Sequence, residues 1–522
     1  MKKYRILAAA VALAFATSCT TDFLTVENPK AKPIEDYFNT ETTVFESLVA
    51  AYAPLHWPDW FGGYYNPVNI ASDVMADQIW PGGGTATDFG DLKYLARYDA
   101  DGRYTLPGLW SAAYSGVKRS NDVLLYIDWA RDAGNISAES AKLFEAEARA
   151  LRVFYYNWLW KFWGNIPYYE KNLEDPFVCA QIKADEVYDH IITDLEGVIA
   201  LDVLPMVRPE SEAGRVSLAM AYMLYAEITM YQNDASRLPT ALNYMKAIIE
   251  DVHYDLLPDY AEVFKESGEW KSETIYDINY MSEGGRRDWS WVTGEGGTIL
   301  PRLIGPRGWE DGYAGYLSGW GMGPVRTSTV EMFDDADARK AATCFDVASL
   351  AEAGGKTYEN TAYQHTGYYL QKYAPLDANR QGCIADWQMN FNNNLRVYRY
   401  SETLLNAAEL VLRNYGSGDA AAWLNAVHGR SLPGTTVEAT LENVKKERAL
   451  EFVGEGKRYW DLVRWELTAD PDGIQASKVL TGHDEMNFRQ ITWSSSKKYI
   501  PIPDAEISAA AGTAYPLTQN NY

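Results

Sequence analysis

Six charged residues recur at steps of three or four between Asn443 and Trp465, where the chain reads NVKKERALEFVGEGKRYWDLVRW. They are Arg448, Glu451, Glu455, Arg458, Asp461 and Arg464. A catalytic centre is one interpretation of such a cluster, but the same spacing on a helix places opposite charges one turn apart, where they pair. Apolar residues such as Leu450 fill much of the remaining surface, so the block must be partly enclosed. We therefore interpret the six charges as a partly buried ion-pair network.

Motifs for catalysis or metal binding are absent from the sequence. The histidines show no metal-ligand spacing; they are His56, His190, His253, His365, His428 and His483. No H-E-x-x-H, G-x-S-x-G or phosphate-loop motif occurs. Paired carboxylates for glycoside hydrolysis need proximity only in space, so this alternative stays open. Nothing in the sequence indicates an enzyme, and the one metal it leaves open is a structural calcium ion without a dedicated loop.

Aromatic residues combined with polar ones indicate a binding site instead. The chain contains 18 Trp and 37 Tyr, which is a high content for a protein of 522 residues. Flat aromatic faces stack on the apolar faces of sugar rings, and Asp, Asn, Gln or Arg side chains bind sugar hydroxyls. One cluster runs from Asp73 to Gly84 and another from Arg286 to Trp320. The predicted ligand-binding residues are Asp73, Trp80, Trp289, Trp291, Trp309 and Trp320.

Each aromatic candidate has a structural alternative. Tryptophans within helical patterns are expected in the core, and this group contains Trp110, Trp158, Trp160, Trp163, Trp423 and Trp465. By contrast, the predicted ligand-binding tryptophans after residue 286 lie among Gly, Pro and Arg, where exposed aromatic residues are often functional. Asp73 fits a turn or a helix cap equally well.

The elements that must position these residues are mostly helices. Helical spacing of apolar residues predicts helices over residues 40–52, 107–129, 138–163, 185–200, 216–231 and 240–250. Ser137 caps the third of them and residues 164–167 end it. Successive helices suggest pairs of the tetratricopeptide kind, although no 34-residue period can be scored. Helical periodicity fades between residues 265 and 390, which predicts functional loops. Gly454 and Gly456 predict a break within the charged block.

The N-terminus has the pattern of an export signal. A basic start is followed by an apolar run over residues 6–16 and by Ala16-Thr17-Ser18-Cys19. The apolar run is too short for a permanent transmembrane helix. A cysteine directly after such an exit predicts lipoprotein processing, with cleavage before Cys19 and acylation of its thiol. The alternative is an ordinary signal peptide with an incidental cysteine.

The net charge limits the classes of ligand, and the cysteine content limits the possible disulfide bonds. Removal of residues 1–18 takes three basic residues away and changes the formal net charge from −24 to −27. Such an acidic surface repels nucleic acid and polyanionic ligands, while neutral ligands remain compatible with it. Three cysteines remain beyond Cys19, and a pair between Cys344 and Cys383 is an open alternative in an oxidising compartment.

The charged block resembles the C-terminal signature of the SusD/RagB outer-membrane lipoproteins of Bacteroidota, E-R-x-x-E-F-x-x-E-G-x-R-x-x-D-L-x-R-W. The matching residues are Glu447, Arg448, Glu451, Phe452, Glu455, Gly456, Arg458, Asp461, Leu462, Arg464 and Trp465. Other segments resemble the same family, namely residues 147–152, 164–167, 214–216, 399–409, 499–503 and 519–522. Asn165 and His428 depart from it, because the family has Asp and usually Arg at these places. The resemblance spans nearly the whole mature chain.

This resemblance implies a mainly α, SusD-like fold of irregular tetratricopeptide-type helix pairs with an embedded loop-rich ligand-binding region. The implied parts are a signal peptide (1–18), an N-terminal helical part (19–264), the ligand-binding region (265–394) and a C-terminal helical part (395–522). The implied function is capture of an oligosaccharide outside the cell and its delivery to a SusC-like, TonB-dependent outer-membrane transporter, without covalent chemistry. The first alternative is a protein of the same family that captures a peptide. The second is a secreted glycoside hydrolase.

Overall fold

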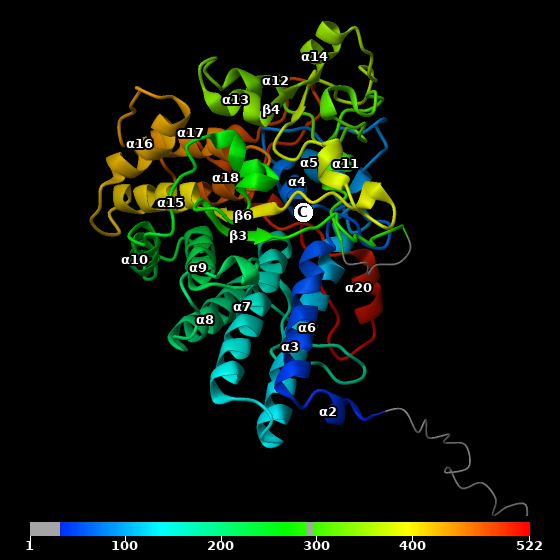
Figure 1. Ribbon diagram of the computed structural model, residues 1–522, viewed down its shortest axis with the longest axis vertical. Coiled ribbons are helices and arrows are strands. Elements are labelled where there is room, and N and C mark those ends of the chain that lie inside the picture. Colours follow the sequence, from blue (N-terminus) through cyan, green and yellow to red (C-terminus); the bar gives the residue numbers. More distant parts are fainter. Residues whose placement is uncertain (1–31, 290–295) are drawn as a thin grey trace, which may run out of the picture.

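The computed structural model describes residues 32–289 and 296–522, and this part of the chain is mainly helical (Figure 1). Its first helices are α2 (Ile34–Tyr37), α3 (Glu41–Tyr52), α4 (Val68–Asp73), α5 (Gly90–Arg97), α6 (Pro107–Asp132), α7 (Ala138–Trp163), α8 (Ala184–Ala200), α9 (Leu218–Gln232) and α10 (Leu238–Ile249). Those that follow are α11 (Leu300–Ile304), α12 (Thr327–Glu331), α13 (Ala338–Thr343), α14 (Val347–Gly354), α15 (Tyr400–Leu412), α16 (Ala420–Ser431), α17 (Leu441–Glu451), α18 (Arg458–Glu466), α19 (Ala476–Val479) and α20 (Asp504–Ala510).

Strands are few and short in the described residues. They form antiparallel pairs, which are β1 (Ile166–Pro167) with β2 (Gln181–Ile182), β3 (Thr274–Ile278) with β6 (Leu395–Arg399), and β4 (Cys344–Asp346) with β5 (Tyr368–Leu370). The mainly α fold class is thereby confirmed. Sheets this small cannot form a core of their own, so packed helices must supply it.

Long helices of the first half pack against one another in chain order, in the lower part of Figure 1. The six predicted helices are confirmed as α3, α6, α7, α8, α9 and α10. α7 begins where Ser137 Oγ accepts a hydrogen bond from Ser140 N at 3.0 Å. It ends at Gly164, whose φ of +67° is readily adopted by glycine. Nearly all of its second half is buried, which accounts for its long aromatic run.

The helices of the last quarter join this helical layer. α15 packs on both α10 and α16, while α18 contacts α9 and α4. One hydrophobic cluster extends from Val44 in α3 to Ile502 near the C-terminus. The two halves of the chain therefore share a core, and their successive helix pairs fit the tetratricopeptide-type arrangement that the sequence predicts.

The loop-rich region lies between two strands that pair with each other. β3 stands near its start and β6 at its end, and their pairing brings Thr274 opposite Arg399. Short helices and turns fill the chain between them, including α11 to α14 and β4, which occupy the upper part of Figure 1. The region is therefore an insertion whose two ends are held together by the pairing of β3 with β6. Its loops project from one end of the helical layer.

Two other sequence-based expectations concern the membrane and the cysteines. None of the helices in the described residues is long and apolar enough to cross a membrane. Within the same residues, Cys179, Cys344 and Cys383 are all free thiols, so the alternative of a bond between Cys344 and Cys383 is not realised. The predicted lipidation site, Cys19, lies outside the described residues.

Candidate functional site

Two segments that the sequence marks as polar and aromatic lie side by side. Isolated bridges join Ile79 to Val325 and Gly82 to Met322, and Trp80 N donates a hydrogen bond to Pro324 O at 2.8 Å. Glycine is required at position 82, because a Cβ there would lie 2.2 Å from the carbonyl oxygen of Gly321. The segment after α4 is thus attached directly to the loop-rich region.

Three aromatic rings form the centre of the candidate site. The rings of Trp289 and Trp320 are stacked, with centroids 5.9 Å apart and an angle of 17° between their planes. Tyr65 stands edge-on to Trp320 at 5.4 Å and 84°. Trp289 is 38 % exposed, and the other two rings are half-buried. We call Tyr65, Trp289 and Trp320 the aromatic platform.

A buried ion pair fixes the segment that carries Trp289. Arg287 Nη1 lies 3.0 Å from Asp59 Oδ2, and both side chains are buried. The same Asp59 oxygen accepts hydrogen bonds from Thr298 Oγ1 at 2.7 Å and from Ile299 N at 2.9 Å. One carboxylate therefore holds the chain on both sides of residues 290–295, and the charge of Arg287 is used for structure instead of for ligand binding.

Close backbone packing holds Trp320. Its N–H donates to Arg302 O at 2.8 Å, at the level of α11. Gly319 comes so near to Gly305 that a Cβ would meet its backbone at 2.2 Å. Rings supported in this way lose little conformational freedom when a flat ligand stacks on them.

An open cleft of about 530 Å³ adjoins the platform. Its lining combines rings with polar groups, and consists of Gly63, Tyr64, Tyr65, Asp88, Phe89, Gly90, Asp91, Leu92, Arg307 and Trp320. Arg307 Nε lies 3.2 Å from Glu359 Oε2, and its Nη1 donates to Trp320 O at 3.4 Å, which leaves the N–H groups of Nη2 for a ligand. Burial raises the pKa of Asp91 to about 6, against an opposing hydrogen bond from Asn66. Aromatic rings beside hydrogen-bonding groups suit a ligand with flat apolar faces and hydroxyl edges.

Polar groups also border the platform on the side of Trp289. Trp289 Nε1 donates a hydrogen bond to Asp386 Oδ2 at 2.6 Å. Next to Asp386, the short helix η8 (Trp387–Met389) carries Gln388, whose Oε1 accepts from Arg302 Nε at 3.0 Å. These contacts join the loop after β5 to the loops that hold the two tryptophans.

The structure corrects three of the six predicted ligand-binding residues. Asp73 and Trp80 have no exposed surface, and Trp309 retains 3 %. Asp73 Oδ2 accepts a hydrogen bond from Gly456 N at 2.9 Å, so the carboxylate links the end of α4 to the charged block. As buried side chains, these three cannot stack on or bind a ligand at the surface.

The neighbours of the two buried tryptophans explain their position. Trp80 lies beneath the guanidinium of Arg326, whose Cζ is 3.7 Å from the ring centroid. Trp309 belongs to a small satellite core with Phe345 and Tyr369. In both cases aromatic packing takes place inside the molecule, although the surrounding sequence has the composition of a loop.

Of the three other predicted ligand-binding residues, two lie in the candidate site and one lies outside the described residues. Trp289 and Trp320 come together in the aromatic platform, and their role in ligand binding stays a prediction. Trp291 lies outside the described residues. Sequence reasoning missed Tyr65, Asp91, Arg307 and Asp386. A signal existed for Tyr65, because it stands between Gly62-Gly63 and Asn66-Pro67, which is the same mixture of aromatic and turn residues that marked the other loops.

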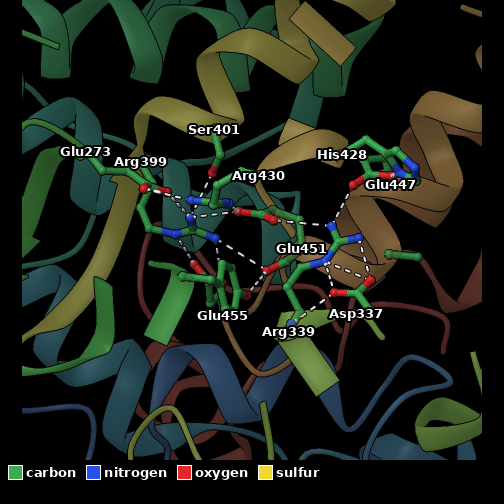
Figure 2. Close-up of polar contacts among 12 residues, drawn as sticks. Glu273, Asp337, Arg339, Arg399, Ser401, His428, Arg430, Glu447, Glu451 and Glu455 are labelled. Atoms are coloured by element: carbon green, nitrogen blue, oxygen red, sulfur yellow. Dashed lines mark hydrogen bonds and ion pairs between the residues drawn. The ribbon is translucent and has the colours of Figure 1, made fainter. Parts of the chain in front are cut away.

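The charged block is an ion-pair network, as predicted, but its partners come mostly from other elements (Figure 2). Glu451 lies at its centre, 3.0 Å from Arg399, 2.5 Å from Arg430 and 3.3 Å from Arg339. Arg399 also pairs with Glu455 at 2.8 Å. All five side chains are nearly or fully buried. Carboxylates saturated by buried guanidinium groups cannot reach a ligand, so the network is structural.

Metal binding has no ligand set in the part of the chain that the structure describes. No three His, Cys, Asp or Glu side chains gather there in a way that could hold a metal ion. The structural calcium ion that the sequence leaves open thus stays an expectation without assigned ligands.

Comparison with known proteins places these features in a family. The sequence model described as "SusD family" matches residues 286–522, and the one described as "Starch-binding associating with outer membrane" matches residues 22–230. A SusD-like protein of Bacteroides ovatus is 26 % identical over 493 residues, which cover 89 % of this chain and 83 % of that protein.

Solved structures are similar over almost the whole chain. Surface glycan-binding protein A from Bacteroides thetaiotaomicron, in complex with laminarihexaose, is 49 % identical, with a TM-score of 0.87, and the match covers 92 % of this chain and all of that one. A laminarin-binding SusD-like protein is 26 % identical, with a TM-score of 0.79, and the match covers 92 % and 99 %. On the strength of these matches and of the fold, the chain belongs to the SusD family.

Proposed function

We propose that this protein captures an oligosaccharide of β-1,3-linked glucose at the cell surface and passes it to a SusC-like, TonB-dependent outer-membrane transporter. The observation that carries the proposal is the aromatic platform, in which two stacked tryptophans border an open cleft in the loop-rich region. The relative that shares 49 % of its residues was solved with laminarihexaose, a ligand of this chemical class.

The geometry gives each part of the platform a task in capture. Sugar rings stack their apolar faces on Trp320 and Trp289, which gives affinity at low entropic cost because the rings are already held in place. Hydroxyl groups bind to Arg307 and Asp91 on the cleft side. A neutral ligand is compatible with the formal net charge of −24, while a polyanionic one is repelled.

Delivery follows from reversible binding. Stacking and hydrogen bonds form and break without a covalent intermediate, so a bound oligosaccharide can be released intact to a neighbouring transporter. A lipid on Cys19 tethers the protein to the outer membrane, and the family match named for outer-membrane association supports that location. The helical layer offers an extended surface for contact with the transporter.

Isothermal titration calorimetry tests capture directly. Laminarihexaose should bind the wild-type protein, and a cello-oligosaccharide of the same length should bind more weakly. Replacement of Trp320 by Ala (W320A) should lower the affinity for laminarihexaose by about fivefold to thirtyfold, because it removes a stacking surface worth about 1–2 kcal/mol. The matched control is W129A, at a half-buried tryptophan of α6 that lines neither the platform nor its cleft.

The same titrations distinguish the alternatives. Shorter sugars in the mixture after incubation would identify a glycoside hydrolase and contradict capture without chemistry. Peptide binding together with silence towards all glycans would favour the peptide-capturing alternative. Equal affinities of W320A and W129A for laminarihexaose would contradict the site assignment while leaving the ligand class intact.

A further inference from the structure

Trp270 presents an aromatic ring to solvent at a second cleft. The residue is 44 % exposed and lies between η5 (Glu266–Gly268) and β3. The cleft beside it has a volume of about 210 Å³ and is lined by residues 207–208, 213–215, 217, 253–254, 270–272 and 274–277. It shares no lining residue with the cleft next to Trp320. The two aromatic surfaces are therefore separate.

A single amide fixes the edge of the Trp270 ring. Asn279 Oδ1 accepts hydrogen bonds from Trp270 Nε1 at 3.1 Å and from Asn394 Nδ2 at 3.1 Å, while its Nδ2 donates to Ala213 O at 2.9 Å. Gly214 makes room for this amide, because a Cβ there would lie 2.3 Å from Asn279 Nδ2. Three separate segments thus contribute to the orientation of one exposed ring.

The backbone of Trp270 is held in an unfavourable conformation. Its φ is +57°, in the left-handed region that bulky residues rarely adopt. The preceding residue is anchored, because buried Glu269 accepts a hydrogen bond from Asn394 N at 3.0 Å and lies 3.4 Å from Arg396 Nη1. Strain of this kind persists only where the surrounding structure enforces it, and it concentrates at functional sites. Core packing does not account for it here, since 44 % of the residue is exposed.

The charges around the cleft favour a neutral ligand. Arg208 and Arg215 line it, but Glu147 pairs with both guanidinium groups and Glu212 pairs with both as well, at distances between 2.5 and 3.0 Å. His253 Nδ1 lies 2.8 Å from Asp251. An acidic ligand would find both guanidinium charges already compensated, and Lys271 is the one cation in the lining without an ion pair among the described residues. Hydroxyl groups can still form hydrogen bonds with the polar groups at the edge of the cleft.

We propose that the Trp270 cleft is a second carbohydrate-binding site, which takes a neutral pyranose ring on the exposed indole face. The ligand class rests on the proposed function. The sugar units that bind at Trp270 belong to the same glycan chain as those captured at the aromatic platform. A polysaccharide then contacts the protein at two points, and the second contact is favoured by the high local concentration that the first creates. A short oligosaccharide occupies only one site at a time.

The test compares a polymer with an oligomer in four variants: W270A, W320A, the double variant W270A/W320A, and Y515A. Affinity electrophoresis in laminarin gels reports polymer binding, and calorimetry with laminarihexaose reports the platform. W270A should weaken retention by laminarin by about tenfold or more, as loss of bivalent contact predicts, with less than about twofold change in laminarihexaose affinity at the platform. W320A should keep weak laminarin retention, and the double variant should lose it.

Controls separate binding from folding. Y515A removes another exposed aromatic side chain, 46 % exposed, and should behave as wild type. W270F keeps an aromatic face and should retain most of the polymer binding that W270A loses. Identical laminarin retention by W320A and W270A/W320A, or by W270A and wild type, overturns the second site alone. A wild-type protein that binds neither glucan overturns both this proposal and the proposed function.

Discussion

Asp386 is the residue that sets the direction of Trp289. Its Oδ2 accepts the indole hydrogen bond at 2.6 Å, and its Oδ1 accepts from Gln388 N at 3.0 Å at the start of η8. The indole is 38 % exposed, so packing alone does not hold it. A polar partner at the edge of an exposed ring keeps the ring face presented to a ligand before the ligand arrives.

Replacement of Asp386 by Ala should therefore weaken laminarihexaose binding by about fivefold, since one hydrogen bond contributes about 1 kcal/mol. Calorimetry measures the affinity. The thermal unfolding midpoint should fall by only about 1–2 °C, because half-buried Asp386 contributes a single capping hydrogen bond to η8, a helix of three residues. Asn at this position retains an acceptor oxygen, so D386N should keep most of the affinity. If D386A binds like wild type, Trp289 is held by other contacts.

Residue type and neighbourhood predict the platform only in part. Trp320 and Trp80 both lie within two residues of a glycine in loop-like sequence, yet one borders a cleft and the other is fully buried. The difference arises from Arg326, which lies far away in the chain and covers Trp80. Composition shows that a loop contains a large aromatic residue, but which side of the loop faces the interior depends on long-range contacts.

At the scale of elements, the turn between α17 and α18 connects the charged block to α4. Gly454 and Gly456 have φ values of +81° and +76°, which confirms the predicted break in the helix. At Gly456 a Cβ would lie 2.7 Å from the Cα of Asn69, while the backbone N–H donates to Asp73. The glycine is needed both for its backbone conformation and for the close approach of α4.

Replacement of Gly456 by Ala should destabilise the protein by about 3 kcal/mol or more, since strain at positive φ and a backbone clash add together. Gly473 is a matched control: its φ is +73°, but no heavy atom lies within 4 Å of a Cβ built there. G473A should lose only about 1 kcal/mol. Thermal and denaturant unfolding measure both, and equal losses would show that contact with α4 contributes nothing.

Helix positions were predictable because periodicity is a local property. α3, α6 to α10 and the loop-rich region all follow the pattern of the sequence. The bridges from Ile79 to Val325 and from Gly82 to Met322 were not predictable, since single residue pairs far apart in the chain leave no period. The candidate site depends on these bridges, so its location was predictable to the region and its lining was not.

At the scale of the whole molecule, the pKa values of buried carboxyl groups shift in two opposite directions. Burial raises the pKa of Asp73 and of Glu269 to about 7, and that of Asp277 to about 6. Burial also acts on Glu227, but the ammonium of Lys161 prevails and lowers the pKa of Glu227 to about 2. Glu451 is likewise lowered by its arginine partners in spite of burial.

These shifts predict a stability maximum at mildly acidic pH. Groups with a raised pKa bind protons in the folded state while the unfolded chain does not, so stability rises as the pH falls from about 8 to about 5. Groups with a lowered pKa act in the opposite way, and their contribution is lost as the pH falls below about 4.5. His56 opposes the first trend, because burial lowers its pKa to about 4, but it is one group against several.

Asp73 allows this prediction to be tested at a single position. Its Oδ2 accepts a hydrogen bond from Gly456 N, and its Oδ1 has no hydrogen-bond partner among the described residues. Asn keeps the acceptor and the shape but never becomes charged. D73N should therefore raise the thermal unfolding midpoint by about 3 °C at pH 8, where the wild-type carboxylate is ionised in the folded and the unfolded chain, and by only about 1 °C at pH 5, where the unfolded chain alone carries the charge. The surface variant D128N should show neither effect, and an equal shift of D73N at both pH values would contradict a titrating Asp73.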